Sequence, residues 1–334
     1  MFCIKRSALV FADNLDNMQK KQYIRTIQKT TTCFLGMALL LVSFSPLAQT
    51  PEPVKSHTTS AIRFSSSKEA KAFCQSTVLR LPNISLAQCF ATQLVDSGAK
   101  SVNGVPLYTQ DVRPEEPRLR VLVLGGIHGD EMSSTSVALH WINLIKQNPT
   151  EVHWRFIPLL NPDGLQAKPS KRVNARGVDL NRNFPTPNWH KQAKIYWEQR
   201  TKKDPRRWPG PSPLSEPESK FLHTEMERFK PNLIVSIHAP FGVLDFDGPS
   251  VPPGKLGRLY LDQVGIYPGS LGNYGGIHKR IPVVTIELPH AQRTPLDAEM
   301  RQMWLDLMRW MSERIQPVEE IKSTPIKLSP EPMS

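Results

Sequence analysis

The sequence predicts an α/β fold in which helices pack against a largely parallel or mixed β-sheet. Short apolar runs bounded by turn residues alternate along the chain with stretches whose apolar residues recur at helical spacing. The 334 residues are 39% hydrophobic and 22% charged, a composition that supports a substantial core and excludes wholesale disorder. Ligands of such sheets bind beyond the carboxyl ends of the strands, so the residues that follow each strand are the first candidates for a functional site.

The predicted elements begin with a short helix around residues 70–78, followed by alternating stretches that end in 101–109. From residue 119 the apolar runs become short and compact, as is typical of buried strands. Buried strands are predicted at 119–124, 152–160, 233–237 and 282–288, and a helix is predicted at 132–145. The alternation of these strands with helical stretches is what favours the α/β class.

The last element, 296–315, is predicted to be an amphipathic helix. Its apolar side carries Met300, Met303, Trp304, Leu307, Met308 and Met311. We interpret this stripe as core packing rather than a cofactor site. Ahead of it, residues 189–213 form a basic, aromatic and Pro-rich insertion, predicted to be a surface loop with at most one helical turn. The insertion either attracts an anionic polymer or is simply solvated.

The N-terminal segment has the order of a secretory signal peptide. Basic residues precede an apolar run at 33–44, and small residues follow it, with cleavage expected near Ala48. This run is too short to span a bilayer core comfortably, although an uncleaved anchor is the alternative. We therefore expect residues 1–48 to be a signal peptide with a long n-region, starting at Met1 or Met18. The protein is then periplasmic or secreted.

The rest of the chain divides into a linker and small lead-in at 49–100, one folded domain at 101–316, and a polar, Pro-rich tail at 317–334 that is expected to be disordered. The formal net charge of +12 falls to +8 without residues 1–48, which carry six basic and two acidic residues. Such a charge suits anionic partners, but export and the lack of a binding motif oppose nucleic acid. Cys74 and Cys89 remain after cleavage, either as a disulfide or as two buried thiols.

A candidate metal site follows the first compact strand, in the motif Gly-Gly-Ile-His-Gly-Asp-Glu at 125–131. His128 and Glu131 can both reach one cation, and zinc accepts imidazole nitrogen and carboxylate oxygen. A catalytic zinc needs a third protein ligand. His238, at the end of the strand at 233–237, is the candidate, and a hydrogen-bonded core histidine is the alternative.

Further chemistry is indicated by Glu287, a carboxylate within the apolar run at 282–288. Burying a glutamate without a partner or a task costs several kcal/mol, about 2–7 for a polar group. A glutamate beside a metal-activated water is a natural general base. In the segment 172–185, Asn181 and Arg182 are candidates for a carboxylate clamp, and Arg172 or Arg176 for stabilising an oxyanion. The alternative for this segment is a solvated, charged loop.

Taken in this order, these residues resemble the zinc carboxypeptidase family usually called M14. The family pattern is His-x-x-Glu, an Arg, Asn-Arg, a distant His and then a Glu, over roughly 101–315 here. The stretches Asn-Pro-Asp-Gly at 161–164, Gly-Val-Asp-Leu-Asn-Arg-Asn-Phe-Pro at 177–185 and Pro-Gly-Ser-Leu-Gly at 268–272 look most like the murein peptide amidase branch. The combination is specific, whereas each piece alone is not.

The resemblance implies a three-layer sandwich with a mixed, mostly parallel twisted sheet and helices on both faces. It implies one zinc ion bound by His128, Glu131 and His238, with Glu287 as general base. By the same resemblance, Arg172 stabilises the oxyanion, and the substrate's free carboxylate is held by Asn181 and Arg182. The mobile active-site tyrosine of the family has no clear counterpart in this sequence, where the candidates are Tyr267 and Tyr274.

The function implied is that of an exported zinc metallopeptidase that hydrolyses peptidoglycan stem peptides at the γ-D-glutamyl–meso-diaminopimelate bond. The alternatives are a general protein metallocarboxypeptidase, an aspartoacylase-like deacylase of N-acyl amino acids, and a non-catalytic wall-binding protein. The intact metal and base residues oppose the last of these. We expect a monomer that contacts a membrane only through an uncleaved signal anchor, if at all.

Overall fold

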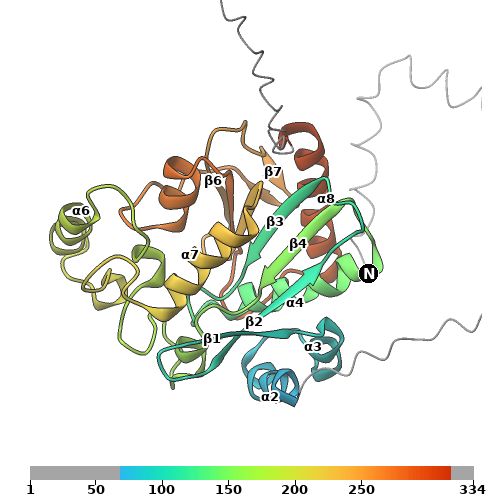
Figure 1. The fold of residues 1–334 in the computed structure, drawn as a ribbon, viewed down its shortest axis with the longest axis horizontal. Coiled ribbons are helices and arrows are strands. Elements are labelled where there is room, and N and C mark those ends of the chain that lie inside the picture. The colour runs from blue at the N-terminus through green and yellow to red at the C-terminus, as the bar shows by residue number, and fades with distance from the viewer. Residues whose placement is uncertain (1–67, 317–334) are drawn as a thin grey trace, which may run out of the picture. The chain divides into compact units, whose positions relative to one another are not determined.

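A computed structural model describes residues 68–316 of the chain, and a seven-stranded sheet lies at its centre (Figure 1). The strand order is β1-β2-β4-β3-β5-β9-β6. Four of these strands are β1 (Val95–Lys100), β2 (Pro106–Val112), β3 (Leu119–Leu124) and β4 (Val152–Ile157). The other three are β5 (Leu233–His238), β6 (Val243–Asp247) and β9 (Val283–Glu287), and a separate hairpin contains β7 (Lys255–Leu256) and β8 (Leu259–Tyr260).

The central strands β4, β3, β5 and β9 pair in parallel, whereas β2 and β6 run antiparallel to their neighbours. The sheet is therefore mixed and mostly parallel, as predicted. Because parallel strands share one direction, the carboxyl ends of β3, β5 and β9 meet at the same edge of the sheet. That edge is where the predicted site residues follow their strands.

Helices cover both faces of the sheet (Figure 1). In β3, Val121 and Val123 pack in one core cluster and Leu122 and Leu124 in the other, because successive side chains of a strand point to opposite faces. The first cluster includes residues of α2 (Lys68–Thr77), α3 (Leu86–Thr92), α4 (Met132–Gln147) and α8 (Asp297–Arg314). The second includes residues of α7 (Pro217–Phe229) and η5 (Gly272–His278), whereas Leu165 of the short α5 (Pro162–Gln166) packs in the first. This arrangement confirms the predicted three-layer α/β sandwich.

One predicted strand of the sheet is shorter than expected, and one strand was not predicted. The strand predicted at 152–160 ends at Ile157, because Pro158 has no backbone N–H to continue the ladder. The strand β6 was not predicted, since its sequence Val-Leu-Asp-Phe-Asp contains two aspartates, which are depleted in strands. Its apolar residues Leu244 and Phe246 pack in the first core cluster. Its aspartates consequently point to the opposite face of the sheet.

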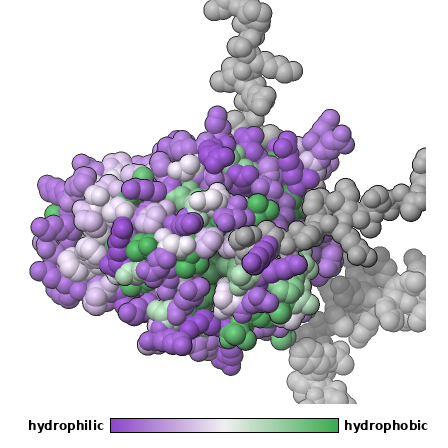
Figure 2. Space-filling view, turned by 60° about the horizontal axis from the view of Figure 1, so that its bottom comes forward, coloured by the Kyte–Doolittle hydropathy of each residue, from purple (hydrophilic) through white to green (hydrophobic). Residues whose placement is uncertain are grey.

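The basic insertion is more helical than predicted. It contains α6 (Trp189–Ile195), the π-helical η3 (Tyr196–Arg200) and the 3-10 helix η4 (Pro205–Arg207). The helix is anchored because Trp189 is buried and its indole Nε1 donates to the Arg182 carbonyl at 2.8 Å. Most of the cations of the insertion are nevertheless exposed, and the side of the molecule that carries α6 is mainly hydrophilic (Figure 2). The prediction that this segment lies at the surface is confirmed.

The stripe of Met and Trp residues on α8 is core packing, as predicted, with Met300, Met303, Trp304 and Met311 all buried. Residues 68–100 contribute to the same core as the predicted folded domain, through α2, α3, the short η1 (Val78–Arg80) and strand β1. A Cys74–Cys89 disulfide joins α2 to α3. The boundary at residue 100 stays a prediction.

The predictions for 1–48, 49–67 and 317–334 lie outside the described residues. Within 68–316, none of the helices is both long enough and apolar enough to cross a membrane.

Candidate active site

The loop between β3 and α4 carries two of the predicted metal ligands, His128 and Glu131. The glycines of its motif are required by close packing and by backbone conformation. Gly126 has a φ of +57°, and a Cβ at Gly129 would lie 2.2 Å from the backbone of Gly164. The loop can therefore fold tightly against the start of α5 and direct both side chains inward. Glu131 occupies the N-cap position of α4, but its carboxylate does not cap the helix and is free to face the site.

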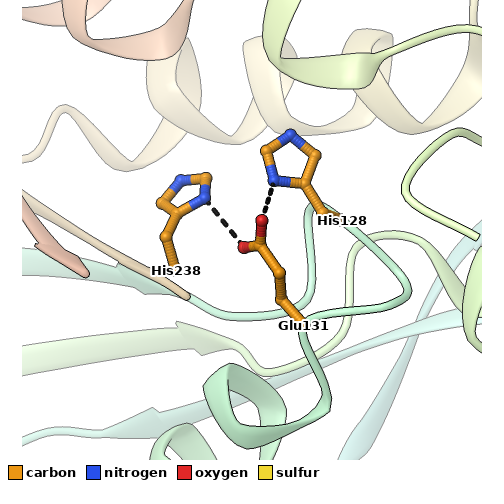
Figure 3. Close-up of side chains that lie close together, drawn as sticks. All are labelled: His128, Glu131 and His238. Carbon is orange, nitrogen blue, oxygen red and sulfur yellow. Dashed lines mark hydrogen bonds and ion pairs between the residues drawn. The ribbon is translucent and has the colours of Figure 1, made fainter. Parts of the chain in front are cut away.

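The third predicted ligand, His238, is the last residue of β5 and faces the same point (Figure 3). The His128 Nδ1 atom lies 2.8 Å from Glu131 Oε1, and the His238 Nδ1 atom lies 3.1 Å from Glu131 Oε2. All three side chains are buried, and their ligand atoms lie within 4.8 Å of one another. Two imidazole nitrogens and one carboxylate are the donor set of many catalytic zinc sites, so these residues fit the predicted ion.

The charge of Glu131 is favoured by its surroundings. Burial raises the pKa of this carboxyl group, but the adjacent His128 and His238 outweigh the effect and hold the pKa well below its usual range. Glu131 is therefore ionised at neutral pH, as a metal ligand must be.

The Nε2 atoms of both histidines, which face away from Glu131, also have partners. His128 Nε2 lies 3.1 Å from Asp179 Oδ1, and His238 Nε2 lies 2.9 Å from the Ser236 hydroxyl. These contacts fix the ring orientations and leave both Nδ1 atoms facing Glu131. Neither Asp179 nor Ser236 was predicted. A signal existed for Asp179, because an aspartate between Val178 and Leu180 is as unusual in a buried segment as Glu287 is in its strand.

Glu287 is the last residue of β9 and lies in register with His238 of the neighbouring parallel strand. The two side chains therefore point to the same face of the sheet. Glu287 is buried, and its Oε2 atom has no hydrogen-bond partner. Burial, and secondarily the charge of Glu131, raises the pKa of this carboxyl, although His238 acts in the opposite direction. A carboxylate with one unpartnered oxygen and a raised pKa beside a metal group is suited to exchanging protons.

Of the two candidate oxyanion cations, the structure brings only Arg172 to the metal group. Its Nε donates to Asp179 Oδ2 at 3.0 Å, and its NH1 lies 3.4 Å from Glu131 Oε1. Arg176 instead points to Glu216, at 3.6 Å, and its side chain is 56% exposed.

Asn181 and Arg182 lie in η2 (Leu180–Arg182) and line the same cleft as the metal group. The side-chain oxygen of Asn181 accepts a hydrogen bond from the Leu271 backbone N–H at 2.8 Å. Arg182 is 4% exposed, its Nε has no hydrogen-bond partner, and burial lowers the pKa of its guanidinium. A buried guanidinium with an unused donor is a natural anion-binding group.

The structure separates the two candidate tyrosines. Tyr267 lines the cleft, and its ring lies 4.5 Å from the Arg182 guanidinium. Tyr274 is buried in the second core cluster, where its ring stacks on Phe184 and its hydroxyl contacts His223 Nδ1 at 2.7 Å. The one cleft thus holds the predicted base, oxyanion cation, carboxylate clamp and metal group, whose roles remain predictions.

Comparisons with known proteins agree on one family. A family described as zinc carboxypeptidase matches residues 87–244. Murein peptide amidase A of Vibrio campbellii is 34% identical over 215 residues, which cover 61% of this chain and 81% of that relative. Murein peptide amidase A of Escherichia coli K12 is 31% identical over 221 residues, covering 63% of this chain and 88% of the relative.

Among solved structures, carboxypeptidase A from Helicoverpa armigera matches with a TM-score of 0.52 and 16% identity. The match covers 67% of this chain and 71% of that one. At this identity the likeness concerns the fold alone.

Proposed function

This chain belongs to the zinc carboxypeptidase family, and from this premise we propose that it hydrolyses peptidoglycan stem peptides at the γ-D-glutamyl–meso-diaminopimelate bond. Two relatives that carry the name murein peptide amidase A support this substrate class. The observation that carries the proposal is the single cleft that combines the His128–Glu131–His238 group with two buried groups that each keep one unpartnered atom, Oε2 of Glu287 and Nε of Arg182.

The proposed mechanism assigns one task to each group of the cleft. His128, Glu131 and His238 hold zinc, which when bound activates a water molecule and polarises the carbonyl that is attacked. Glu287 accepts a proton from the attacking water and passes it to the leaving amine. Its raised pKa suits both halves of this transfer, because a carboxyl whose pKa lies closer to neutrality both accepts and returns a proton readily.

Arg172 stabilises the negative charge that develops on the carbonyl oxygen. Its guanidinium is held by Asp179 and lies beside Glu131, so it is positioned before the substrate binds. Asn181 and Arg182 bind the free carboxylate of the leaving residue, which places the bond one residue inward at the metal group. Diaminopimelate at the end of a stem tripeptide carries such a carboxylate on the carbon next to the scissile amide.

The proposal includes export to the periplasm or the exterior, where peptidoglycan lies. The Cys74–Cys89 disulfide supports it, because disulfides persist in oxidising compartments. The signal peptide itself is proposed from the order of charges and apolar residues in 1–48.

Product analysis with defined substrates tests the proposal. We expect the purified protein to convert L-Ala-γ-D-Glu-meso-diaminopimelate into L-Ala-D-Glu and free diaminopimelate, with one water added per bond broken. An ordinary peptide with a C-terminal apolar residue and an N-acetyl amino acid serve as comparison substrates. Cleavage of either comparison substrate without cleavage of the tripeptide would assign the protein to the carboxypeptidase or deacylase alternative. A Glu287→Gln variant, purified in the same way, serves as the control, because hydrolysis that persists at the wild-type rate in this variant would come from a contaminating enzyme.

A further inference from the structure

Two aspartates of β6 lie on the wall of the active-site cleft. Leu244 and Phe246 of this strand pack in the core, and Phe246 meets Trp310 of α8 at 5.9 Å between ring centroids. The alternate residues, Asp245 and Asp247, therefore face the other side of the sheet and line the cleft that contains His238, Glu287 and Arg182. The proposed mechanism uses neither of them.

Asp247 is a buried carboxylate without a partner. It is 9% exposed, and within residues 68–316 no hydrogen bond or ion pair engages its oxygens. Asp245, by contrast, accepts a hydrogen bond from the Phe246 backbone N–H at 2.9 Å. A largely buried carboxylate without a protein partner is costly, so a cationic ligand entering the cleft, or a proton, would stabilise Asp247.

The surrounding backbone makes room for this carboxylate. A Cβ at Gly272 would lie 1.9 Å from Asp247 Oδ2, and a Cβ at Gly276 would lie 2.5 Å from the Asp247 Cβ. Both glycines belong to η5, which borders the cleft. Larger residues at these positions would displace the side chain, and the two glycines therefore create the space in which Asp247 sits.

The electrostatic setting of Asp247 favours a cation from outside the protein. Burial raises the pKa of this carboxyl to about 6, and Asp245 contributes in the same direction. No cation within residues 68–316 forms an ion pair with Asp247, and the charged neighbour that shifts its pKa is the acidic Asp245. The cleft therefore contains an anion-binding group at Arg182 and a separate acidic pair at Asp245 and Asp247.

We infer that Asp247, supported by Asp245, binds the distal ammonium group of the diamino acid whose amide bond is hydrolysed. The inference rests on the proposed function and names the feature by which the cleft selects its substrate. The leaving diaminopimelate has one carboxylate next to the scissile amide, proposed to bind Asn181 and Arg182. The far end of its side chain carries a second amino group and a second carboxylate. This amino group is protonated at neutral pH and matches a buried acidic pair.

Matched stem tripeptides test this subsite directly. The first ends in meso-diaminopimelate, and the second ends in 2-aminopimelate, which keeps the distal carboxylate but lacks the distal amino group. For the wild-type protein we expect kcat/KM to be about 10- to 100-fold higher for the first peptide, the range given by one hydrogen bond to a charged group. In Asp247→Asn this ratio should fall toward one, because kcat/KM decreases for the diaminopimelate peptide and stays unchanged for the 2-aminopimelate peptide.

A matched control is Asp262→Asn, which removes the same charge from an exposed aspartate near Asp245 that does not line the cleft. We expect it to keep the wild-type ratio. Equal kcat/KM values for the two peptides in the wild-type protein would overturn the subsite while leaving the proposed function intact. An equal decrease of kcat/KM for both peptides in Asp247→Asn would show a structural role for Asp247 and would also overturn the subsite. If wild-type protein cleaves neither peptide, the proposed function fails and the subsite fails with it.

Discussion

The contact between Asp179 and His128 gives a direct test of how the metal group is organised. Asp179 is fully buried, and its carboxylate accepts hydrogen bonds from Arg172 Nε at 3.0 Å and the Asn181 backbone N–H at 3.0 Å, besides its contact with His128 Nε2 at 3.1 Å. The substitution Asp179→Asn keeps the shape of this side chain but removes its charge. The Nε2 atom of His128 then loses its carboxylate partner, whereas the contact of Nδ1 with Glu131 remains, and Arg172 Nε faces a neutral amide.

Two effects of Asp179→Asn follow from these contacts. Loss of a group that orients a metal-binding histidine typically lowers metal affinity about 10- to 100-fold. Breaking a buried ion pair costs about 3–5 kcal/mol, and we expect about 3 kcal/mol because Glu131 still lies 3.4 Å from Arg172 NH1. For a domain of this size, such a loss lowers Tm by about 6–12 °C. Zinc competition with a chelator measures the first effect, and thermal unfolding of the metal-free protein measures the second.

Asp111→Asn is the matched control for this experiment. Asp111 also bridges a histidine and an arginine, with His153 Nε2 at 2.6 Å and Arg155 NH2 at 3.0 Å, but it lies on β2 and its side chain is 37% exposed. We expect a loss of about 1 kcal/mol or less, because exposed pairs contribute little, and an unchanged zinc affinity. Wild-type zinc affinity in Asp179→Asn would refute the reasoning that this carboxylate positions His128.

Three further predictions concern the base, the disulfide and the acidic pair. Glu287→Gln should lower kcat about 100- to 10,000-fold while the protein retains its zinc, as steady-state kinetics and metal analysis will show; undiminished turnover would remove Glu287 from the mechanism. Replacing Cys74 and Cys89 by serine should lower the free energy of unfolding by about 3 kcal/mol in denaturant titrations, since the bridge closes a loop with a separation of 15 residues. Because the pKa of Asp247 is about 6 and only its ionised form attracts an ammonium group, the diaminopimelate preference should decline as the pH falls below 6. A preference that stays constant from pH 7 to 5 would contradict this assignment.

The metal group was predictable from the sequence because its residues follow strands that have clear patterns. Compact apolar runs identified β3, β5 and β9, and the parallel arrangement of these strands brings His128, His238 and Glu287 to one edge. Glu287 was conspicuous because a carboxylate within an apolar strand requires a reason.

Other features depend on contacts between distant residues, which no local pattern reveals. Asp179 is recognised as a partner of His128 only when the fold joins positions that are 51 residues apart. The strand β6 was missed because its aspartates weaken the strand pattern, although they face the cleft in the structure. The places of Tyr267 and Tyr274 also depend on the fold, since only the structure shows that Tyr267 lines the cleft and that Tyr274 is buried.

The central claim is that one zinc ion, held by His128, Glu131 and His238, makes this protein a stem-peptide hydrolase. Titration of metal-free protein with zinc, followed by the rate of tripeptide hydrolysis, tests it most directly. We predict that activity rises from background in proportion to added zinc and saturates at one equivalent per chain, and that His238→Ala stays inactive at that level. Full activity in metal-free protein, or an undiminished response in His238→Ala, would contradict the account.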